Sequence, residues 1–232
     1  VSGTTITVVD SEEATNRLGD NQVRGVRGCF DSTANVGLLV LSTGNSPTKT
    51  SFHAIQLDAS RAITIGTELV VNDRYNKGSN GSIVHDAASG VNILFHYSKY
   101  NSVNESEDNF PSVTPITISG TTPTVGVSTQ IDATAAVDGI VVYDSNAEAT
   151  VAIFEQSNTL KYSVIKATSG AILKPGTVTT LEATREFGSA ADSVMGCFNP
   201  LSGKIVIAYR NSTTTTTSYV RSGKRFGTSI DW

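Results

Sequence analysis

An aromatic residue or a histidine, followed directly by an acidic residue or its amide, recurs four times along the chain. The four pairs are separated by 55, 58 and 55 residues and are Phe30-Asp31, His85-Asp86, Tyr143-Asp144 and Phe198-Asn199. A period of this length is typical of repeat architectures, in which each unit buries its apolar surface against its neighbours. This repeat constrains the fold more than any other feature of the sequence.

Each repeat predicts four short strands. The second strand of each unit follows the pair after a turn and is continuously apolar, which indicates burial on both faces. We expect second strands at 37–41, 91–95, 150–154 and 204–209 and third strands at 52–57, 113–118, 160–165 and 215–220. A Ser-Gly or similar turn then leads to fourth strands at 63–70, 124–131, 172–181 and 225–232, with Gly-Thr at matching positions in three of them, Gly66, Gly176 and Gly227.

Antiparallel four-stranded units repeated at this spacing predict an all-β fold, a β-propeller of about four four-stranded blades. We expect a single domain over 1–232, with repeat units at 16–73, 74–134, 135–184 and 185–232. Residues 1–15 match the end of a unit and are expected to form an extra outer strand. Two arrangements stay open: a compact propeller closed by that strand, or a segment of a longer array whose open edges favour a homo-oligomer.

The acidic or amide residue of each pair begins the turn between the first and second strands. Asp and Asn side chains at such positions accept hydrogen bonds from backbone amides two or three residues further on, and a later Gly or Asn closes the turn. Calcium would require more oxygen ligands than these turns offer. We therefore interpret Asp31, Asp86, Asp144 and Asn199 as turn-forming residues, and we expect neither a metal nor a cofactor.

Composition narrows the classes of partner. The chain carries 17 Lys and Arg against 21 Asp and Glu, so the electrostatic attraction needed for nucleic-acid binding is weak. Its apolar runs are too short for a membrane-spanning helix, and its start, at Val1, lacks the features of a secretory signal, which favours a processed chain or an excised domain. Ser and Thr make up 57 of 232 residues, which favours strands and turns. Nucleic acid and membrane insertion are not expected.

Side chains capable of catalysis do not form a recognisable motif in the sequence. His85 occupies the aromatic position of its repeat and is expected to be a partly buried blade residue, and neither His53 nor His96 has a partner at metal-ligand spacing. The acidic cluster at 105–108 lies in a polar loop, where solvated carboxylates are the more common outcome. Cys29 and Cys197 are expected to be free thiols, since matching positions in different blades lie too far apart for a disulfide. We expect a protein that is not an enzyme.

The fourth unit is the most informative about family. It runs Cys197-Phe-Asn-Pro-Leu-Ser-Gly-Lys-Ile-Val-Ile-Ala-Tyr-Arg-Asn, followed by Val220-Arg-Ser-Gly and Phe226-Gly-Thr. This pattern resembles the repeat of tail-fibre and tail-associated proteins of marine bacteriophages, including those that infect cyanobacteria. The second unit departs from it by an acidic insertion, and the third has Phe154-Glu155 where an aromatic residue and Arg are expected. The resemblance implies a virion or extracellular location, with other virion proteins or a host-surface glycan as partners.

The insertion in the second unit is the candidate ligand-binding surface, because loops on a rigid scaffold present side chains to partners. It spans 97–111 and combines amides and acids with three aromatic residues, Tyr97, Tyr100 and Phe110. The alternative is a surface loop without a binding role. A weaker candidate lies at 74–76, with Arg74 and Tyr75.

Three functions follow from these patterns. The first is a non-enzymatic, virion-associated structural or adhesin protein, a phage tail or fibre component involved in host attachment. The second is a carbohydrate-binding propeller lectin or a cell-surface protein. The third, and least favoured, is a glycan-cleaving enzyme.

Overall fold

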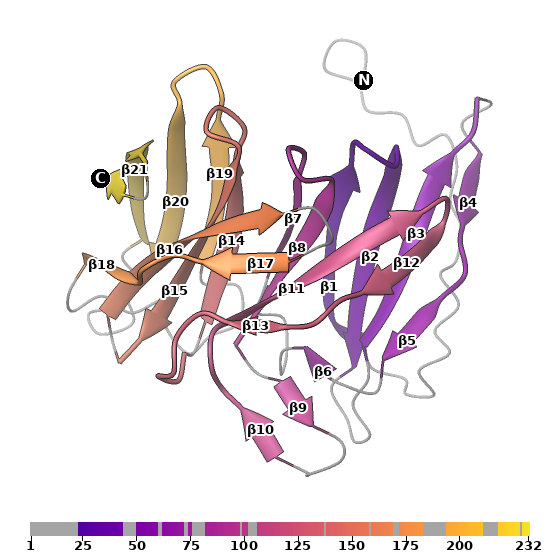
Figure 1. Ribbon diagram of the computed structural model, residues 1–232, viewed down its shortest axis with the longest axis horizontal. Coiled ribbons are helices and arrows are strands. Elements are labelled where there is room, and N and C mark those ends of the chain that lie inside the picture. Colours follow the sequence, from indigo (N-terminus) through magenta and orange to yellow (C-terminus); the bar gives the residue numbers. More distant parts are fainter. Residues whose placement is uncertain are drawn as a thin grey trace.

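The computed structural model of the chain describes a protein built from β-strands (Figure 1). Within the described residues no helix is long and apolar enough to cross a membrane. The expected outer strand at 1–15 lies outside the described residues. The structure describes residues 23–43, 50–59, 62–71, 74–75, 82–97, 99–101, 106–136, 138–157, 159–168, 172–182, 194–210, 218–227 and 229–232.

Four antiparallel sheets follow one another along the chain, and each repeats the same order of strands. The first strands are β1 (Val23–Asp31), β7 (Ile83–Asp86), β14 (Asp138–Asp144) and β19 (Val194–Asn199). The second strands are β2 (Val36–Thr43), β8 (Val91–His96), β15 (Ala149–Gln156) and β20 (Lys204–Arg210). The third strands are β3 (Thr50–Leu57), β11 (Ser112–Ser119), β16 (Thr159–Thr168) and β21 (Ser218–Phe226).

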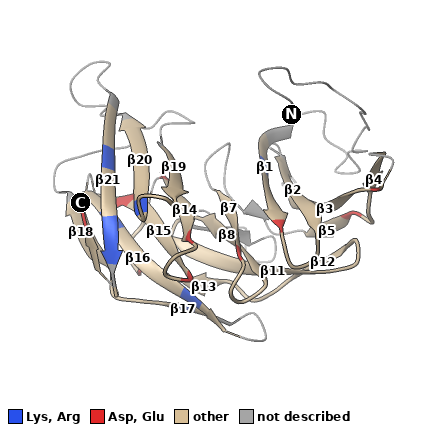
Figure 2. Cartoon of the chain, turned by 90° about the horizontal axis from the view of Figure 1, so that it is seen from above, with Lys and Arg blue, Asp and Glu red and all other residues tan. Residues whose placement is uncertain are grey.

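The sheets are the blades of a four-bladed β-propeller, as the repeat predicts. Their first strands lie side by side, β1 next to β7, β7 next to β14 and β14 next to β19. Seen from above, the blades fan outward from these inner strands (Figure 2). We number the blades 1 to 4 in chain order.

Hydrophobic cores fill the seams between consecutive blades, because each sheet is apolar on both faces. Every residue of β8 and β15 is buried, which confirms the expectation for these two second strands, whereas β2 and β20 alternate between buried and partly exposed residues. The described residues form three such cores. Representative pairs across the seams are Val40 with Leu94 between blades 1 and 2, Phe95 with Phe154 between blades 2 and 3, and Val151 with Ile207 between blades 3 and 4.

The outer strand is divided into two short segments in each of the first three blades. The segments are β4 (Ile63–Ile65) and β5 (Leu69–Val71), β12 (Thr122–Val125) and β13 (Thr129–Gln130), and β17 (Ile172–Pro175) and β18 (Thr179–Glu182). At each break a glycine amide donates to a carbonyl oxygen of the third strand, over 2.8 Å, from Gly66, Gly126 and Gly176. Gly66, Gly126 and Gly176 are therefore the equivalent glycines of the first three blades. The prediction that Gly227 is equivalent to Gly66 and Gly176 is wrong.

Blade 4 ends differently from the sequence prediction. The predicted Ser222-Gly223 turn lies inside β21, and the turn falls at Gly227, whose φ of 60° suits glycine, before β22 (Ser229–Asp231). The physical reason is packing: a Cβ at Gly223 would lie 2.7 Å from the indole ring of Trp232. Glycine is needed here so that the ring can lie against the strand.

The insertion of the second unit contains two short strands. The hairpin of β9 (Lys99–Asn101) and β10 (Ser106–Asp108) pairs with β6 (Arg74–Tyr75) in a small separate sheet. Its register places Tyr100 opposite Arg74. The two candidate segments of the sequence are therefore neighbours in space.

We predict that Gly139→Ala weakens the packing between blades 2 and 3. A Cβ at this position would lie 2.5 Å from the ring of Phe95, which stacks on Phe154, and 2.8 Å from the carbonyl oxygen of Ile153. Overpacking of this kind lowers the free energy of unfolding by about 1–3 kcal/mol, measurable by urea denaturation. Gly37→Ala is the matched control, because its nearest contact would be an ordinary 3.6 Å. Equal stabilities of the two variants would contradict the packing described here.

Candidate functional site

The turn after each inner strand is built as the sequence predicts. The side-chain oxygen of the Asp or Asn accepts hydrogen bonds from backbone amides two or three residues further on, over 2.8–3.3 Å. These residues are Asp31, Asp86, Asp144 and Asn199, and their role as turn-formers is confirmed. A left-handed residue closes each turn, namely Asn35, Gly90, Glu148 and Gly203. Only the third turn, closed by Glu148, departs from the expected Gly or Asn.

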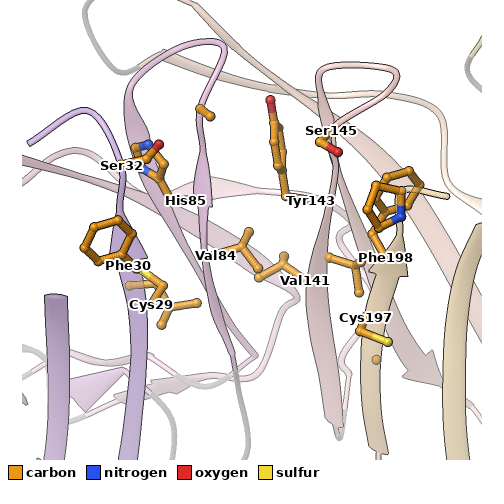
Figure 3. Close-up of a pocket in the computed structure, with 15 residues that line it drawn as sticks. Cys29, Phe30, Ser32, Val84, His85, Val141, Tyr143, Ser145, Cys197 and Phe198 are labelled. Carbon is orange, nitrogen blue, oxygen red and sulfur yellow. The ribbon is translucent and has the colours of Figure 1, made fainter. Parts of the chain in front are cut away.

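These turns surround a hollow at one end of the inner strands (Figure 3). The hollow has a volume of about 540 Å³, within the range of small-molecule sites. All four inner strands contribute equivalent positions to its wall: the aromatic position of the repeat, the residue before it and the residue two positions after it. The aromatic positions are Phe30, His85, Tyr143 and Phe198. The residues before them are Cys29, Val84, Val142 and Cys197, and the residues two positions after them are Ser32, Ala87, Ser145 and Pro200. We call this feature the axial hollow.

The aromatic residues of the axial hollow differ in exposure. The Phe30 ring is 58% exposed, whereas Phe198 packs partly against the core between blades 3 and 4. Tyr143 stands between them, and its hydroxyl oxygen accepts a hydrogen bond of 3.2 Å from the amide of Ala88 in blade 2. Burial is the main cause that raises the pKa of the Tyr143 hydroxyl, and nearby carboxylates add to it. Tyr143 therefore presents a neutral phenol to the hollow.

His85 is only 9% exposed, which confirms its prediction as a buried blade residue. It belongs to a polar network between blades 1 and 2. Its Nδ1 lies 3.1 Å from Oδ1 of Asn92, and its Nε2 lies 3.3 Å from the Thr33 hydroxyl and 3.5 Å from Asp31. The Asn92 amide in turn donates to Oδ2 of Asp31 over 2.7 Å. The network holds the imidazole in place and joins the two blades.

A second buried carboxylate joins blades 3 and 4. Oδ2 of Asp144 lies 3.5 Å from Nε of Arg225, and the same guanidinium donates to the carbonyl oxygen of Ala147 over 2.9 Å. Beside it, the Asn146 amide donates to the carbonyl oxygen of Pro200 over 3.2 Å. The rim of the axial hollow is thus tied across this seam as well.

The three residues predicted from the insertion do not lie in the axial hollow. Tyr97 is partly buried and packs against the core between blades 2 and 3. Phe110 is partly exposed, and its carbonyl oxygen accepts a hydrogen bond of 3.2 Å from the Ser112 hydroxyl. Tyr100 lies on β9 beside Arg74, and its side chain is outside the described part of the structure. A binding role for this surface stays a prediction.

A Ser-His-Glu grouping lies in blade 1, away from the axial hollow. Nε2 of His53 lies 3.2 Å from the Ser51 hydroxyl and 3.6 Å from Oε1 of Glu68. In a catalytic triad the carboxylate holds the other ring nitrogen, so that Nε2 can act as the base. Here the Ser51 hydroxyl and the Glu68 carboxylate both lie next to Nε2 of His53. This geometry therefore does not form a catalytic triad.

Metal ligands are not grouped in the described residues: no three His, Cys, Asp or Glu side chains there are placed to hold an ion. The two thiols are free, as predicted, with Cys29 partly buried and Cys197 exposed. Burial, together with the charge of Asp31, raises the pKa of the Cys29 thiol to about 12. Both thiols lie in the wall of the axial hollow.

Sequence reasoning did not identify the axial hollow as a site. It found the four aromatic positions but interpreted them as structural. These positions are far apart in the sequence, so their closeness in space is not evident from it. The signal was nevertheless present, since positions that recur in every repeat of a propeller must lie around one axis.

The fold and the hollow together define a class, a four-bladed β-propeller with a hollow at its axis. No protein-family model matches the chain, and no curated protein matches it.

We predict that the two thiols differ strongly in reactivity. With a pKa of about 12, Cys29 is almost entirely protonated near neutral pH, and only the thiolate reacts with alkylating reagents. In dilute native protein one thiol, Cys197, should be alkylated rapidly, while Cys29 reacts only after unfolding. Peptide mass analysis of the labelled chain identifies the site. Equal labelling of both thiols in the native state would contradict the burial of Cys29.

We also predict that His53 makes stability depend on pH. Burial lowers the His53 pKa below its ordinary 6.5, an effect that Glu68 partly offsets. The unfolded chain then binds the proton more readily, so stability is highest above pH 6.5 and falls as the pH decreases below it. The melting temperature should decrease between pH about 7.5 and about 5.5, and His53→Gln should reduce that decrease. An unchanged slope in this variant would show that other groups are responsible.

Proposed function

We propose that the protein is a non-enzymatic structural and adhesin module of a virion, a phage tail or fibre component. In this role it contacts a host-surface glycan or another virion protein. The resemblance of its repeat to those of marine phage tail proteins supports the location. The composition of the axial hollow supports binding.

The observation that carries the proposal is the side-chain chemistry of the axial hollow. The residues that line it include Phe30, Tyr143 and Phe198, together with His85, aliphatic side chains and the hydroxyl residues Ser32 and Ser145. Among the described residues that line it there is no Lys, Arg, Asp or Glu. A wall of this kind, in which polar and apolar surface are mixed, favours an uncharged ligand that combines C–H faces with hydroxyls. A neutral sugar has this chemistry.

The titratable groups nearest the hollow favour binding over cleavage. Hydrolysis of a glycoside usually needs two carboxyl groups that flank the bond. Asp31 and Asp144 are 1% and 3% exposed, and their oxygens accept the turn amides and face the next blade. They therefore serve the fold.

The second candidate is a propeller lectin or cell-surface protein outside a virion. The same hollow favours it, because the chemistry of sugar recognition does not depend on the particle that carries the site. The location of the protein distinguishes the two. Antibodies raised against the chain should label tails of particles purified from the gene's source. Labelling confined to cell surfaces would instead support the second candidate.

Binding and its site can be tested with a glycan array. We expect retention of neutral glycans without any change in their mass, and Tyr143→Ala should weaken binding by about tenfold or more through loss of an aromatic contact. Leu201→Ala is the matched control, since this residue is 98% exposed on a neighbouring turn and does not line the hollow.

Tyr100→Ala tests the insertion as the alternative surface. Loss of binding in this variant alone would move the site to the insertion and leave the adhesin role intact. Cleavage of any bound glycan would contradict the non-enzymatic proposal.

A further inference from the structure

Each seam of the propeller joins two different faces. The face that a blade turns toward the following blade is called here its C-side face, and the face toward the preceding blade its N-side face. Between blades 1 and 2, for example, Leu38 and Phe52 of the C-side face meet Leu94 and Ile116 of the N-side face. The described residues fill three such seams and leave one face of blade 4 and one face of blade 1 without a blade against them.

The C-side face of blade 4 has the same pattern as the buried C-side face of blade 3. Strand pairing shows the equivalence, because Cys197 opposes Val206 as Val142 opposes Val151. In the third strand, Ala208 opposes Val220 as Ile153 opposes Tyr162. The residues of blade 3 belong to the core of a seam. In blade 4, Met195 and Val220 on this face are 72% and 71% exposed.

The N-side face of blade 1 likewise matches the buried N-side face of blade 2. Gly28 opposes Leu39 as Ile83 opposes Leu94, and Gly37 opposes Ile55 as Asn92 opposes Ile116. In blade 2 the residues Ile83, Leu94 and Ile116 belong to a core. In blade 1 the same face exposes 64% of Val26, 58% of Phe30 and 61% of Leu57, whereas Leu41, Ser51 and His53 on it are buried within the chain.

We infer that blade 4 of one copy stacks on blade 1 of a second copy, head to tail. The two faces are of the complementary types that already pack together at every described seam. Without a partner, the exposed apolar patches on these faces stay in contact with water, which is unfavourable in free energy. Stacking of two copies removes this apolar surface from water. Because the two faces differ, the contact is heterologous and builds either a closed ring of copies or a filament.

Charge favours blade 1 over a second blade 4 as the partner. The C-side face of blade 4 carries Lys204 and Lys224, which oppose each other on the same side of the sheet as Cys197 and Val220. Figure 2 shows Lys and Arg along β21, of which Arg225 pairs with Asp144 across the seam to blade 3. Two copies of the C-side face repel each other through these lysines, which favours blade 1 as the partner.

Two matched substitutions test the contact, each placing a carboxylate on one face only. They are Val220→Glu on blade 4 and Val26→Glu on blade 1, and Leu201→Glu is the control on an exposed turn away from both faces. The parent chain and the control should form a species heavier than 24.4 kDa in light scattering, and each single variant alone should have the mass of one chain. Met195→Glu is a second variant of the blade 4 face.

Mixing the variants gives the decisive result. Val220→Glu retains a functional blade 1 face and Val26→Glu retains a functional blade 4 face, so an equimolar mixture should form a dimer and nothing larger. Cys197, on the blade 4 face, provides a second readout, because stacking covers it. Its alkylation in the parent chain should slow by about tenfold or more once most copies are associated.

Three outcomes would overturn the inference. The first is a parent chain that stays monomeric at high concentration with Cys197 equally reactive throughout. The second is a monomer whose Cys197 is protected at every concentration, which would mean that the chain covers its own face. The third is continued association of both single variants, which would place the contact elsewhere. All variants must unfold at the parental urea midpoint for the comparison to apply.

Discussion

Burial of both faces of the second strands is the constraint on which the rest of the structure depends. In β15, Ala152 and Ile153 point to opposite faces, and both are fully buried. A sheet of this kind cannot be stable with one side in water, so every blade requires a neighbour on each side. The stacking that follows brings the first strands together around one axis. The axial hollow is a geometric consequence of this packing and needs no dedicated domain.

The hollow and the blade faces divide the surface of the protein into two kinds of contact. The hollow is small, and the described residues of its wall include no Lys, Arg, Asp or Glu, which suits an uncharged ligand of limited size. The faces at the two ends of the arc are broad and apolar, and they suit another β-sheet. The proposed adhesion and the inferred assembly can therefore coexist in one chain, because they use largely different residues. Phe30 and Cys197 belong to both surfaces.

The elements that the sequence predicts well are those governed by local chemistry or by burial. The turn role of Asp31 follows from the hydrogen-bonding reach of its own side chain, and the second strands follow from uninterrupted apolar runs. The equivalence of Gly126 to Gly66 escaped prediction, because it depends on which carbonyl of the third strand the glycine amide reaches. The hollow escaped for a similar reason, since its wall joins residues as distant as Ser32 and Pro200. Both features depend on contacts between residues that are distant in the sequence.

The buried carboxylates of the turns have a consequence for how such a chain can evolve. Asp31 meets His85 and Asn92 of blade 2, whereas the equivalent Asp144 meets Arg225 of blade 4. The apolar seams are interchangeable in kind, but these polar contacts are specific to particular neighbours. A duplicated or transposed blade would bury a carboxylate opposite the wrong group, which is costly. The repeats therefore share one pattern but have a fixed order, because these polar contacts make particular blades specific for the one beside them.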